Sequence, residues 1–337
     1  MKHVSILVPK GQAILSNVVG PFKVLMAVNR FLMQTGIRKD KFYDIHLVGI
    51  VKDSYLYDGA FSIHCDSVLR DIGKTDLILI PALRPDNLEN DLQKNAPFVP
   101  WILEKRAKYN AEVASMCLGA FVLAQTGLVD GKACATHWAG MEIFRNMYPK
   151  VDLVPNKVVT EEDGIYSSGG AFSFLNLMLH LVEKYNGRAA AIYISKFFEI
   201  EFGRDNQNQF AIFQGQKDHV DEAIRQAQFY IESNITEKIS VENLAEKFAI
   251  SRRNFVRRFK KATQNTPSEY IQRVRIEAAK RSLESTQKQV NEVMFLVGYS
   301  DQKAFRTVFK KYVGISPVVY KEKYNRGRVN FDQPSAW

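Results

Sequence analysis

The same helical pattern occurs twice near the end of the chain, between residues 240 and 261 and between residues 290 and 311. In each copy, a short helix with apolar periodicity leads into a three-residue turn that ends in a serine, Ser251 or Ser300. Serine is a common helix N-cap, so a second helix is expected to begin at each of these residues. Because this pattern rarely occurs twice in one chain by chance, we predict two helix-turn-helix units.

The second helix of each copy is expected to have two different faces. Phenylalanines four positions apart, Phe255 with Phe259 and Phe305 with Phe309, bury one stripe. The side chains predicted on the opposite faces are Arg253, Asn254, Arg257, Gln302, Lys303 and Arg306. A helix that is buried on one side and rich in basic and amide groups on the other fits the major groove of DNA. Two ordinary helical hairpins with solvated basic faces are the alternative.

The positive charge of the chain is concentrated around this repeat. The formal net charge is +10, and residues 218–330 carry 22 Lys/Arg against 13 Asp/Glu. Residues 1–217 are nearly balanced, with 24 Lys/Arg against 22 Asp/Glu. Such an uneven distribution is typical of a module that contacts phosphates. The cations expected to do so are Arg252, Arg258, Lys260, Lys261, Lys310 and Lys311.

The first two thirds of the chain alternate strand-like and helical segments. This alternation predicts a flavodoxin-like α/β domain with a mostly parallel sheet covered on both faces, followed by an all-α domain. We place the sheet domain at residues 1–198, an amide-rich linker at 199–217, the helical domain at 218–325 and a tail at 326–337. Ligands of parallel sheets bind at the carboxyl ends of the strands, so we look for a site there.

Composition narrows the class of protein further. No window approaches the roughly 18 apolar residues that a membrane span needs. The three cysteines, Cys65, Cys117 and Cys134, form no paired framework and have no zinc-ligand spacing. We therefore predict a cytoplasmic protein with no membrane segment, no metal and no cofactor.

Cys117 is the sharpest candidate for chemistry in the first domain. It follows a strand-like run at 112–116 and precedes a helix start, which is the elbow that exposes a nucleophile. A helix N-terminus at this position is expected to lower the pKa of the thiol. His137 follows another strand-like run and is the candidate base, and such a Cys–His pair is typical of covalent amidases.

Both parts of the chain resemble known families. The helical part resembles the AraC/XylS family of bacterial transcription regulators in its two motifs and in the run from Gly298 to Tyr320. The sheet part is similar to the ThiJ/PfpI branch of the class I glutamine amidotransferase-like superfamily, through residues 115–124, 127–132 and 135–138. The resemblance covers nearly the whole chain, in the domain order of a known regulator subfamily.

This resemblance implies a transcription regulator, often an activator, that binds double-stranded DNA as a homodimer and contacts RNA polymerase. It assigns base reading to Arg253, Asn254, Arg257, Gln302, Lys303 and Arg306. It also implies a rigid central helix, here Pro267–Ser285, and a small-molecule effector, in many members a nitrogen-containing metabolite. Since an effector acts only through different affinities for two arrangements, we hypothesise that Glu199–Lys217 is the element that switches.

The resemblance also bears on catalysis. ThiJ/PfpI enzymes place an acidic residue in the loop after the first strand, and this chain has none between Pro9 and Phe22. The turn at 81–83 also lacks the paired glycines that usually present oxyanion-binding amides. We therefore predict a ligand-sensing pocket rather than an enzyme, lined by Cys117, His137, Asn17 and Trp138. A cysteine-dependent amidase or ThiJ-type enzyme, and a domain that only dimerises, remain the alternatives.

Overall fold

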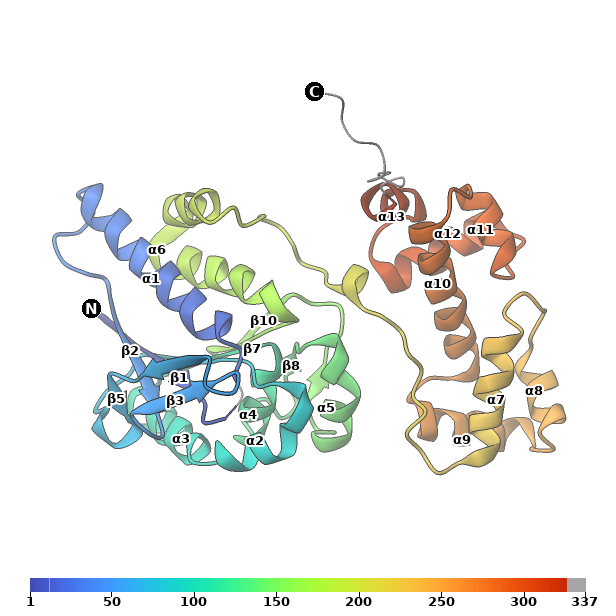
Figure 1. Ribbon diagram of the computed structural model, residues 1–337, viewed down its shortest axis with the longest axis horizontal. Helices are drawn as coiled ribbons and strands as arrows, with labels where there is room; N and C mark the ends of the chain where they lie inside the picture. Colours follow the sequence, from blue (N-terminus) through green and yellow to red (C-terminus); the bar gives the residue numbers. More distant parts are fainter. Residues whose placement is uncertain (12, 326–337) are drawn as a thin grey trace, which may run out of the picture. The chain divides into compact units, whose positions relative to one another are not determined.

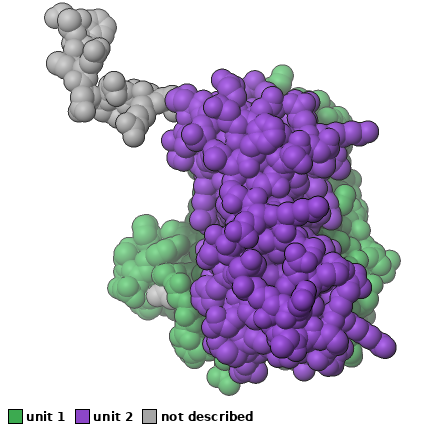
Figure 2. All heavy atoms as spheres, turned by 90° about the vertical axis from the view of Figure 1, so that its right-hand side faces the viewer, with its two compact units in different colours: residues 1–207 green, residues 208–337 purple. Residues whose placement is uncertain are grey.

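The computed structural model describes residues 1–11 and 13–325, and the chain divides into two compact units. The first unit comprises residues 1–207 and the second begins at residue 208, as coloured in Figure 2. The boundary therefore lies inside the segment predicted as a linker. The predicted tail, 326–337, lies outside the described residues.

A seven-stranded sheet forms the centre of the first unit, in the order β10-β11-β7-β6-β1-β2-β5. The strands are β1 (Lys2–Val8), β2 (Tyr43–Gly49), β5 (Ser67–Val68), β6 (Leu77–Ile80), β7 (Glu112–Met116), β10 (Val159–Glu162) and β11 (Ile165–Ser168). All neighbours pair in parallel except β10 and β11, which form an antiparallel hairpin. The mostly parallel α/β fold predicted from the sequence is confirmed.

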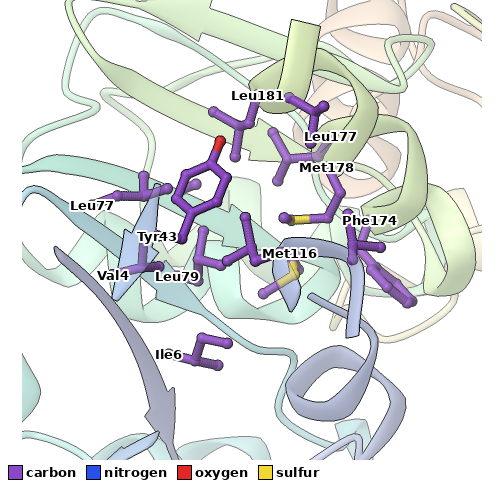
Figure 3. Packing of buried hydrophobic residues seen from close by; sticks show 14 of the residues in the cluster. Val4, Ile6, Tyr43, Leu77, Leu79, Met116, Phe174, Leu177, Met178 and Leu181 are labelled. Atoms are coloured by element: carbon purple, nitrogen blue, oxygen red, sulfur yellow. The ribbon is translucent and has the colours of Figure 1, made fainter. Parts of the chain in front are cut away.

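Helices cover both faces of this sheet (Figure 1). One face packs against α1 (Ser16–Gln34) and α6 (Phe174–Phe197), and Figure 3 shows part of that core, with Tyr43 and Met116 beneath Leu177 and Leu181. The other face packs against α2 (Leu88–Lys94), α3 (Phe98–Tyr109) and α4 (Ala120–Gln125). Burial on both faces explains why strands such as β6 are apolar throughout.

Smaller elements complete the first unit. A hairpin joins β3 (Asp53–Leu56) and β4 (Phe61–His64), and a two-stranded pair joins β8 (Ala133–Cys134) and β9 (Asp152–Leu153). The helix α5 (Met141–Met147) connects β8 to β9. No helix of the described residues is long and apolar enough to cross a membrane.

The start of α1 differs from the sequence prediction. The sequence predicts a loop from Pro9 to Phe22, followed by the first helix. The helix instead begins at Ser16, and Val18 and Pro21 are buried on the same stripe as Val24. Burial of this stripe against the sheet outweighs the backbone hydrogen bond that proline cannot make.

The second unit is helical, as predicted. Its helices are α7 (Glu222–Ser233), α8 (Val241–Lys247), α9 (Arg252–Thr263), α10 (Pro267–Ser285), α11 (Val290–Leu296), α12 (Gln302–Val313) and α13 (Pro317–Tyr324). The central helix α10 has the predicted bounds, and its first turn is fixed by a capping box between Thr266 and Glu269.

Two separate cores lie along α10. Tyr270 and Ile271 pack with α7, α8 and α9, whereas Ile276 and Leu283 pack with α11, α12 and α13. Both helix-turn-helix units are therefore anchored to one continuous helix (Figure 1). The two helix-turn-helix units are thus joined through α10 within the second compact unit.

Candidate functional site

The outward helices α9 and α12 are packed by the same aromatic arrangement. Phe255 and Phe259 of α9 are fully buried, and so are Phe305 and Phe309 of α12. The second phenylalanine of each pair meets a tyrosine edge-on: the ring of Phe259 lies 5.3 Å from Tyr270, and that of Phe309 lies 5.6 Å from its own partner in α13. The buried stripes predicted from the sequence are confirmed.

The caps of these helices correct one detail of the prediction. Ser251 occupies the N-cap of α9, but its side chain makes no cap hydrogen bond. The N-cap of α12 is Asp301 rather than Ser300, and its carboxylate accepts a hydrogen bond from the backbone N–H of Ala304 at 2.6 Å. The two helices thus begin at Arg252 and Gln302, 50 positions apart, and not 49 as the serines suggested. A carboxylate outcompetes the preceding hydroxyl as a cap because it is charged at a helix N-terminus.

This register changes which positions correspond. Arg253 and Lys303 are equivalent, but Gln302 corresponds to Arg252, and Arg257 corresponds to Thr307. The two triplets predicted to read bases are therefore only partly equivalent.

The predicted base-reading side chains are accessible. Arg253, Arg257, Gln302, Lys303 and Arg306 are exposed, and Asn254 is half-buried. Some of them contact each other within the unit. Arg257 donates a hydrogen bond to Asn254 Oδ1 at 2.8 Å, and Gln302 donates one to Asn291 Oδ1 at 2.5 Å.

Two of the predicted phosphate contacts are engaged inside the unit. Arg258 donates two hydrogen bonds to Asp221, at 2.8 and 2.6 Å, and joins α9 to the start of α7. Arg252 donates one to Glu242 at 2.5 Å. Arg258 is thus the member of this set whose geometry favours a packing role over phosphate contact.

The elbow at Cys117 is present as predicted. Cys117 follows β7 directly and has a left-handed backbone conformation, with φ of 54°. Two residues later, Gly119 approaches the neighbouring strand so closely that a Cβ would lie 2.6 Å from the carbonyl oxygens of Ile80 and Pro81. Only glycine fits this turn, which holds Cys117 at the carboxyl edge of the sheet.

The thiol of Cys117 is not activated, so the predicted lowering of its pKa is wrong. Burial raises the pKa of Cys117 to about 11, although hydrogen bonding from the backbone N–H groups of Leu118 and Ala171 acts in the opposite direction. Cys117 is only 6% exposed, and loss of solvation outweighs the effect of the helix N-terminus on the thiol.

His137 is also poorly placed to act as a base. Its Nδ1 accepts a hydrogen bond from the backbone N–H of Ala139 at 3.1 Å, which puts the ring proton on Nε2. Burial lowers the pKa of His137, so the ring is neutral at pH 7. Trp138 packs beside it, with ring centroids 5.2 Å apart.

The predicted pocket residues converge on one short loop after β11. Asn17 Nδ2 donates to the carbonyl oxygen of Ala171 at 3.5 Å, and the backbone N–H of that residue faces the Cys117 thiol. The ring of His137 lies against Gly170, where a Cβ would be 2.7 Å from the imidazole. Thus Asn17, Cys117 and His137 are brought together although they are far apart in the sequence.

Two polar atoms near this loop have no hydrogen-bond partner among the described residues. They are Oδ1 of Asn17 and Oγ of Ser168, both on fully buried side chains. A buried polar atom without a partner costs about 1–3 kcal/mol, so a bound group that donates to it would be stabilised.

Sequence reasoning missed Gln207, whose side chain is 2% exposed. Its Oε1 accepts from the backbone N–H of Gly170 at 2.9 Å. Its Nε2 lies within hydrogen-bond distance of three carbonyl oxygens, those of Thr136, Pro155 and Lys157. The only sequence signal was the run of amides in a segment read as a linker.

Comparison with known proteins agrees with this geometry. The DJ-1/PfpI family model matches residues 6–184, which is more than half of the chain, and a helix-turn-helix domain model matches residues 244–323. The chain belongs to the DJ-1/PfpI family. This DJ-1/PfpI protein carries a second unit of the AraC type, as the sequence motifs predicted.

Relatives of this DJ-1/PfpI protein include two Pseudomonas aeruginosa proteins named as HTH-type transcriptional regulators. GbdR is 27% identical over 216 residues, which cover 64% of this chain and 59% of GbdR. CdhR is 24% identical over 276 residues, which cover 82% of this chain and 80% of CdhR. The alignment with GbdR therefore spans about three fifths of that protein's length.

Among solved structures, a Vibrio parahaemolyticus protein assigned as a transcriptional regulator is similar in fold. Its TM-score is 0.51 at 21% identity, and the match covers 58% of this chain and 98% of that one. At this identity the likeness supports the fold alone.

Proposed function

We propose that this protein is a sequence-specific DNA-binding transcription regulator whose first unit senses a small metabolite. The observation that carries the proposal is the pair of helix-turn-helix units on one continuous helix, α10, each with an exposed basic and amide-rich helix. The match to a helix-turn-helix model and the relatives named as regulators support it.

In this proposal α9 and α12 enter successive major grooves on one side of the duplex. Such grooves are about 34 Å, or ~10 base pairs, apart. Arg253 and Lys303 read guanine edges, whereas Asn254 and Gln302 read adenine edges. The shared central helix fixes the spacing of the two contacts, which selects binding sites with two half-sites at one separation.

A binding assay tests the proposal. The full-length protein is titrated by fluorescence anisotropy against fragments of the promoter next to its own gene and against random duplex, at two salt concentrations. We expect a preference for one fragment that is lost in Lys303→Ala and Arg253→Ala, and a steep decrease of affinity with salt. Lys39→Ala removes an exposed charge from the first unit and serves as the control. Equal affinity for all duplexes, with and without metabolites, would contradict the proposal.

We further propose that the elbow of the first unit binds the effector and does not catalyse. The neutral thiol, the lack of an acidic partner and the engagement of His137 Nδ1 by a backbone N–H argue against an activated nucleophile. The unpartnered Oδ1 of Asn17 and Oγ of Ser168 favour a ligand with N–H or O–H donors, in line with a nitrogen-containing metabolite.

A thermal-shift screen of metabolites against the full-length protein tests this pocket. A ligand that stabilises the protein should lose its effect in Asn17→Ala and Ser168→Ala. The cysteine-dependent enzyme remains the second candidate, because it uses the same elbow. It predicts turnover of the ligand that disappears in Cys117→Ala, whereas a sensor gives no turnover.

Signal transfer is proposed to run through Gln207 and the strap that follows it, residues 208–217. Gln207 is bound to Gly170 and Thr136, which adjoin Ala171 and His137 of the pocket. A ligand that moves the 170–171 loop therefore changes the hydrogen bonds of the residue that ends the first unit.

The strap is held along the second unit by polar contacts to α10 and its neighbours. The carboxylate of Glu277 accepts from the backbone N–H of Phe213 at 3.1 Å, and Lys280 donates to the carbonyl oxygen of Ala211 at 2.6 Å. Glu277 and Lys280 are themselves buried and paired at 2.9 Å. In this proposal, a change in the hydrogen bonds of Gln207 is passed along the strap to α10, which supports both helix-turn-helix units.

The variant Gln207→Ala tests this transfer. It should keep the thermal shift by the effector and the affinity for DNA, but lose the change in DNA affinity that the effector causes. Gln214→Ala removes an exposed amide from the strap and is the matched control. A normal effector response in Gln207→Ala would remove this residue from the signal path.

Finally, we propose a homodimer that activates transcription by contacting RNA polymerase in the cytoplasm. The resemblance to the regulator subfamily supports these points. Sedimentation of the purified protein, and transcription in vitro with RNA polymerase, test them directly.

A further inference from the structure

Three side chains that can bind a metal meet at the amino ends of β1 and β2, at the edge of the sheet opposite to the elbow. His3 lies directly across from Asp44 in the parallel register of the two strands, and His46 follows two positions later in β2. Paired residues in a parallel sheet, and residues two apart in one strand, point to the same face. The strand register therefore places all three side chains together.

The donor atoms are already close to one another. Nδ1 of His3 and Nε2 of His46 each lie 3.0 Å from the same oxygen, Oδ2 of Asp44. All three donor atoms lie within 4.8 Å of each other. Their side chains are 33–35% exposed, so an ion from solvent can reach them.

The backbone that carries the donors is held firmly. The backbone N–H of His3 donates to Asp76 Oδ2 at 2.8 Å, and β1 is paired with a neighbour on each side. Small rotations of side chains are then sufficient to bring the donors around one ion, without movement of the strands.

The donor set selects the class of ion. Two imidazole nitrogens and one carboxylate oxygen suit zinc, whereas calcium and magnesium prefer oxygen alone. Ligands at ~2.0 Å around a tetrahedral zinc ion are about 3.3 Å apart, close to the two 3.0 Å separations seen here. One imidazole is enough to give Asp44 Oδ2 a hydrogen bond. Two imidazoles on the same carboxylate oxygen are what a shared metal ion would require.

We propose that His3, Asp44 and His46 form a zinc-binding site in which the fourth position is open to water or to an outside ligand. The site is independent of the proposed pocket at the elbow and of DNA binding. Zinc there ties the start of β1 to β2 and stabilises the folded first unit, because the unfolded chain does not hold these donors together.

Metal titration of the untagged, full-length protein tests this site after removal of metals with a chelator. We expect one zinc ion per chain by calorimetry, and a rise in melting temperature with zinc. Cobalt should give visible bands of nitrogen and oxygen ligands without the near-ultraviolet band of a cobalt–thiolate bond. Asp44→Ala and His46→Ala should each lower the affinity for zinc at least about tenfold.

His64→Ala is the matched control, since His64 also pairs with a carboxylate, that of Asp53, at 2.8 Å, but no second imidazole among the described residues joins them. It should bind zinc as tightly as the unaltered protein. The proposal is overturned if no zinc binds, if Asp44→Ala and His46→Ala bind it normally, or if the control loses it. A thiolate band would also overturn it, by assigning the metal to a cysteine. Circular dichroism of each variant establishes that it is folded.

Discussion

The two helix-turn-helix units of this protein have the same buried packing but differ on their outer faces. Aligned by their helix starts, both units place phenylalanines at the same two positions, Phe255 with Phe305 and Phe259 with Phe309. The outer positions differ, because the exposed Arg257 of the first helix-turn-helix unit corresponds to the exposed Thr307 of the second. Packing is thus repeated, whereas the charged surface is not.

The difference also concerns how the cations are held. In the first unit, Arg252, Arg257 and Arg258 all make hydrogen bonds to side chains of the same unit. In the second, among the described residues, the Lys303 ammonium and the Arg306 guanidinium make no hydrogen bond or ion pair to another side chain. The repeated fold therefore carries two unlike surfaces, and the proposed DNA-binding function then predicts an asymmetric binding sequence.

The largest expected effect concerns the shared packing. Phe259→Ala and Phe309→Ala should each destabilise the second unit by about 3–5 kcal/mol, because each removes a fully buried ring from one of the two cores. Urea unfolding followed by circular dichroism measures the loss. A loss below ~1 kcal/mol in one variant but not in the other would break the equivalence of the two cores.

Base discrimination should show the next largest effect and would settle the register. Lys303 and Arg253 occupy equivalent positions. Replacing either with alanine should reduce the preference for the native base at one base pair by about 1–3 kcal/mol. Competition binding with a set of single-base changes measures this preference.

The same assay distinguishes Arg252 from Arg257. The sequence assigns base reading to Arg257, but the register of the structure makes Arg252 equivalent to Gln302. If Gln302 reads a base, Arg252→Ala should reduce the base preference at one position of the DNA. Arg257→Ala should then lower the affinity for all DNA sequences by the same factor. The reverse result would support the assignment made from the sequence.

Helix capping should give a smaller and unequal effect. Asp301→Ala removes a side chain that bonds the start of α12, and should cost about 1 kcal/mol of unfolding free energy. Ser251→Ala should cost less, since that hydroxyl makes no cap bond. Thermal unfolding of the two variants measures the difference, and equal losses would contradict it.

The smallest expected effect is a dependence on pH that comes from the pair between Asp221 and Arg258 of the first helix-turn-helix region. A hydrogen bond from Arg258 is the main reason that the pKa of Asp221 is lowered, despite partial burial. A carboxyl whose folded pKa is lowered stabilises the protein above its ordinary pKa, and this contribution is lost as pH falls through the lower value. The pair is partly exposed, so its contribution should stay below ~1 kcal/mol.

Asp221→Asn is the test, because asparagine still caps α7 but carries no charge. Its unfolding free energy should be lower than that of the unaltered protein at pH 7 and should approach it near pH 3. A constant difference over this range would indicate that the ion pair contributes nothing.

Much of the second unit was predictable because its signals are local. Helix periodicity, a proline after Thr266 and paired phenylalanines define α9, α10 and α12 within neighbouring residues. The serine cap of α12 was misplaced by one residue, because two good capping residues, Ser300 and Asp301, stand side by side. Only the hydrogen bond distinguishes them.

The elbow was predictable in position but not in its chemistry. A strand followed by a helix start identifies Cys117, but the pKa of its thiol depends on how deeply the completed fold buries it. Gln207 was not predictable, because its partners lie on segments 37–71 positions earlier in the chain.

By itself, the sequence determined the order of the two domains, the alternation of strands and helices, and the repeated helices with their inner and outer faces. These features depend on periodicity and on caps, which involve neighbours a few residues apart. Tertiary structure alone decided that the thiol of Cys117 stays neutral, that Gln207 lies beside the pocket, and that two histidines share Asp44. Each of these depends on loss of solvent and on contacts between distant segments, which exist only after the chain has folded.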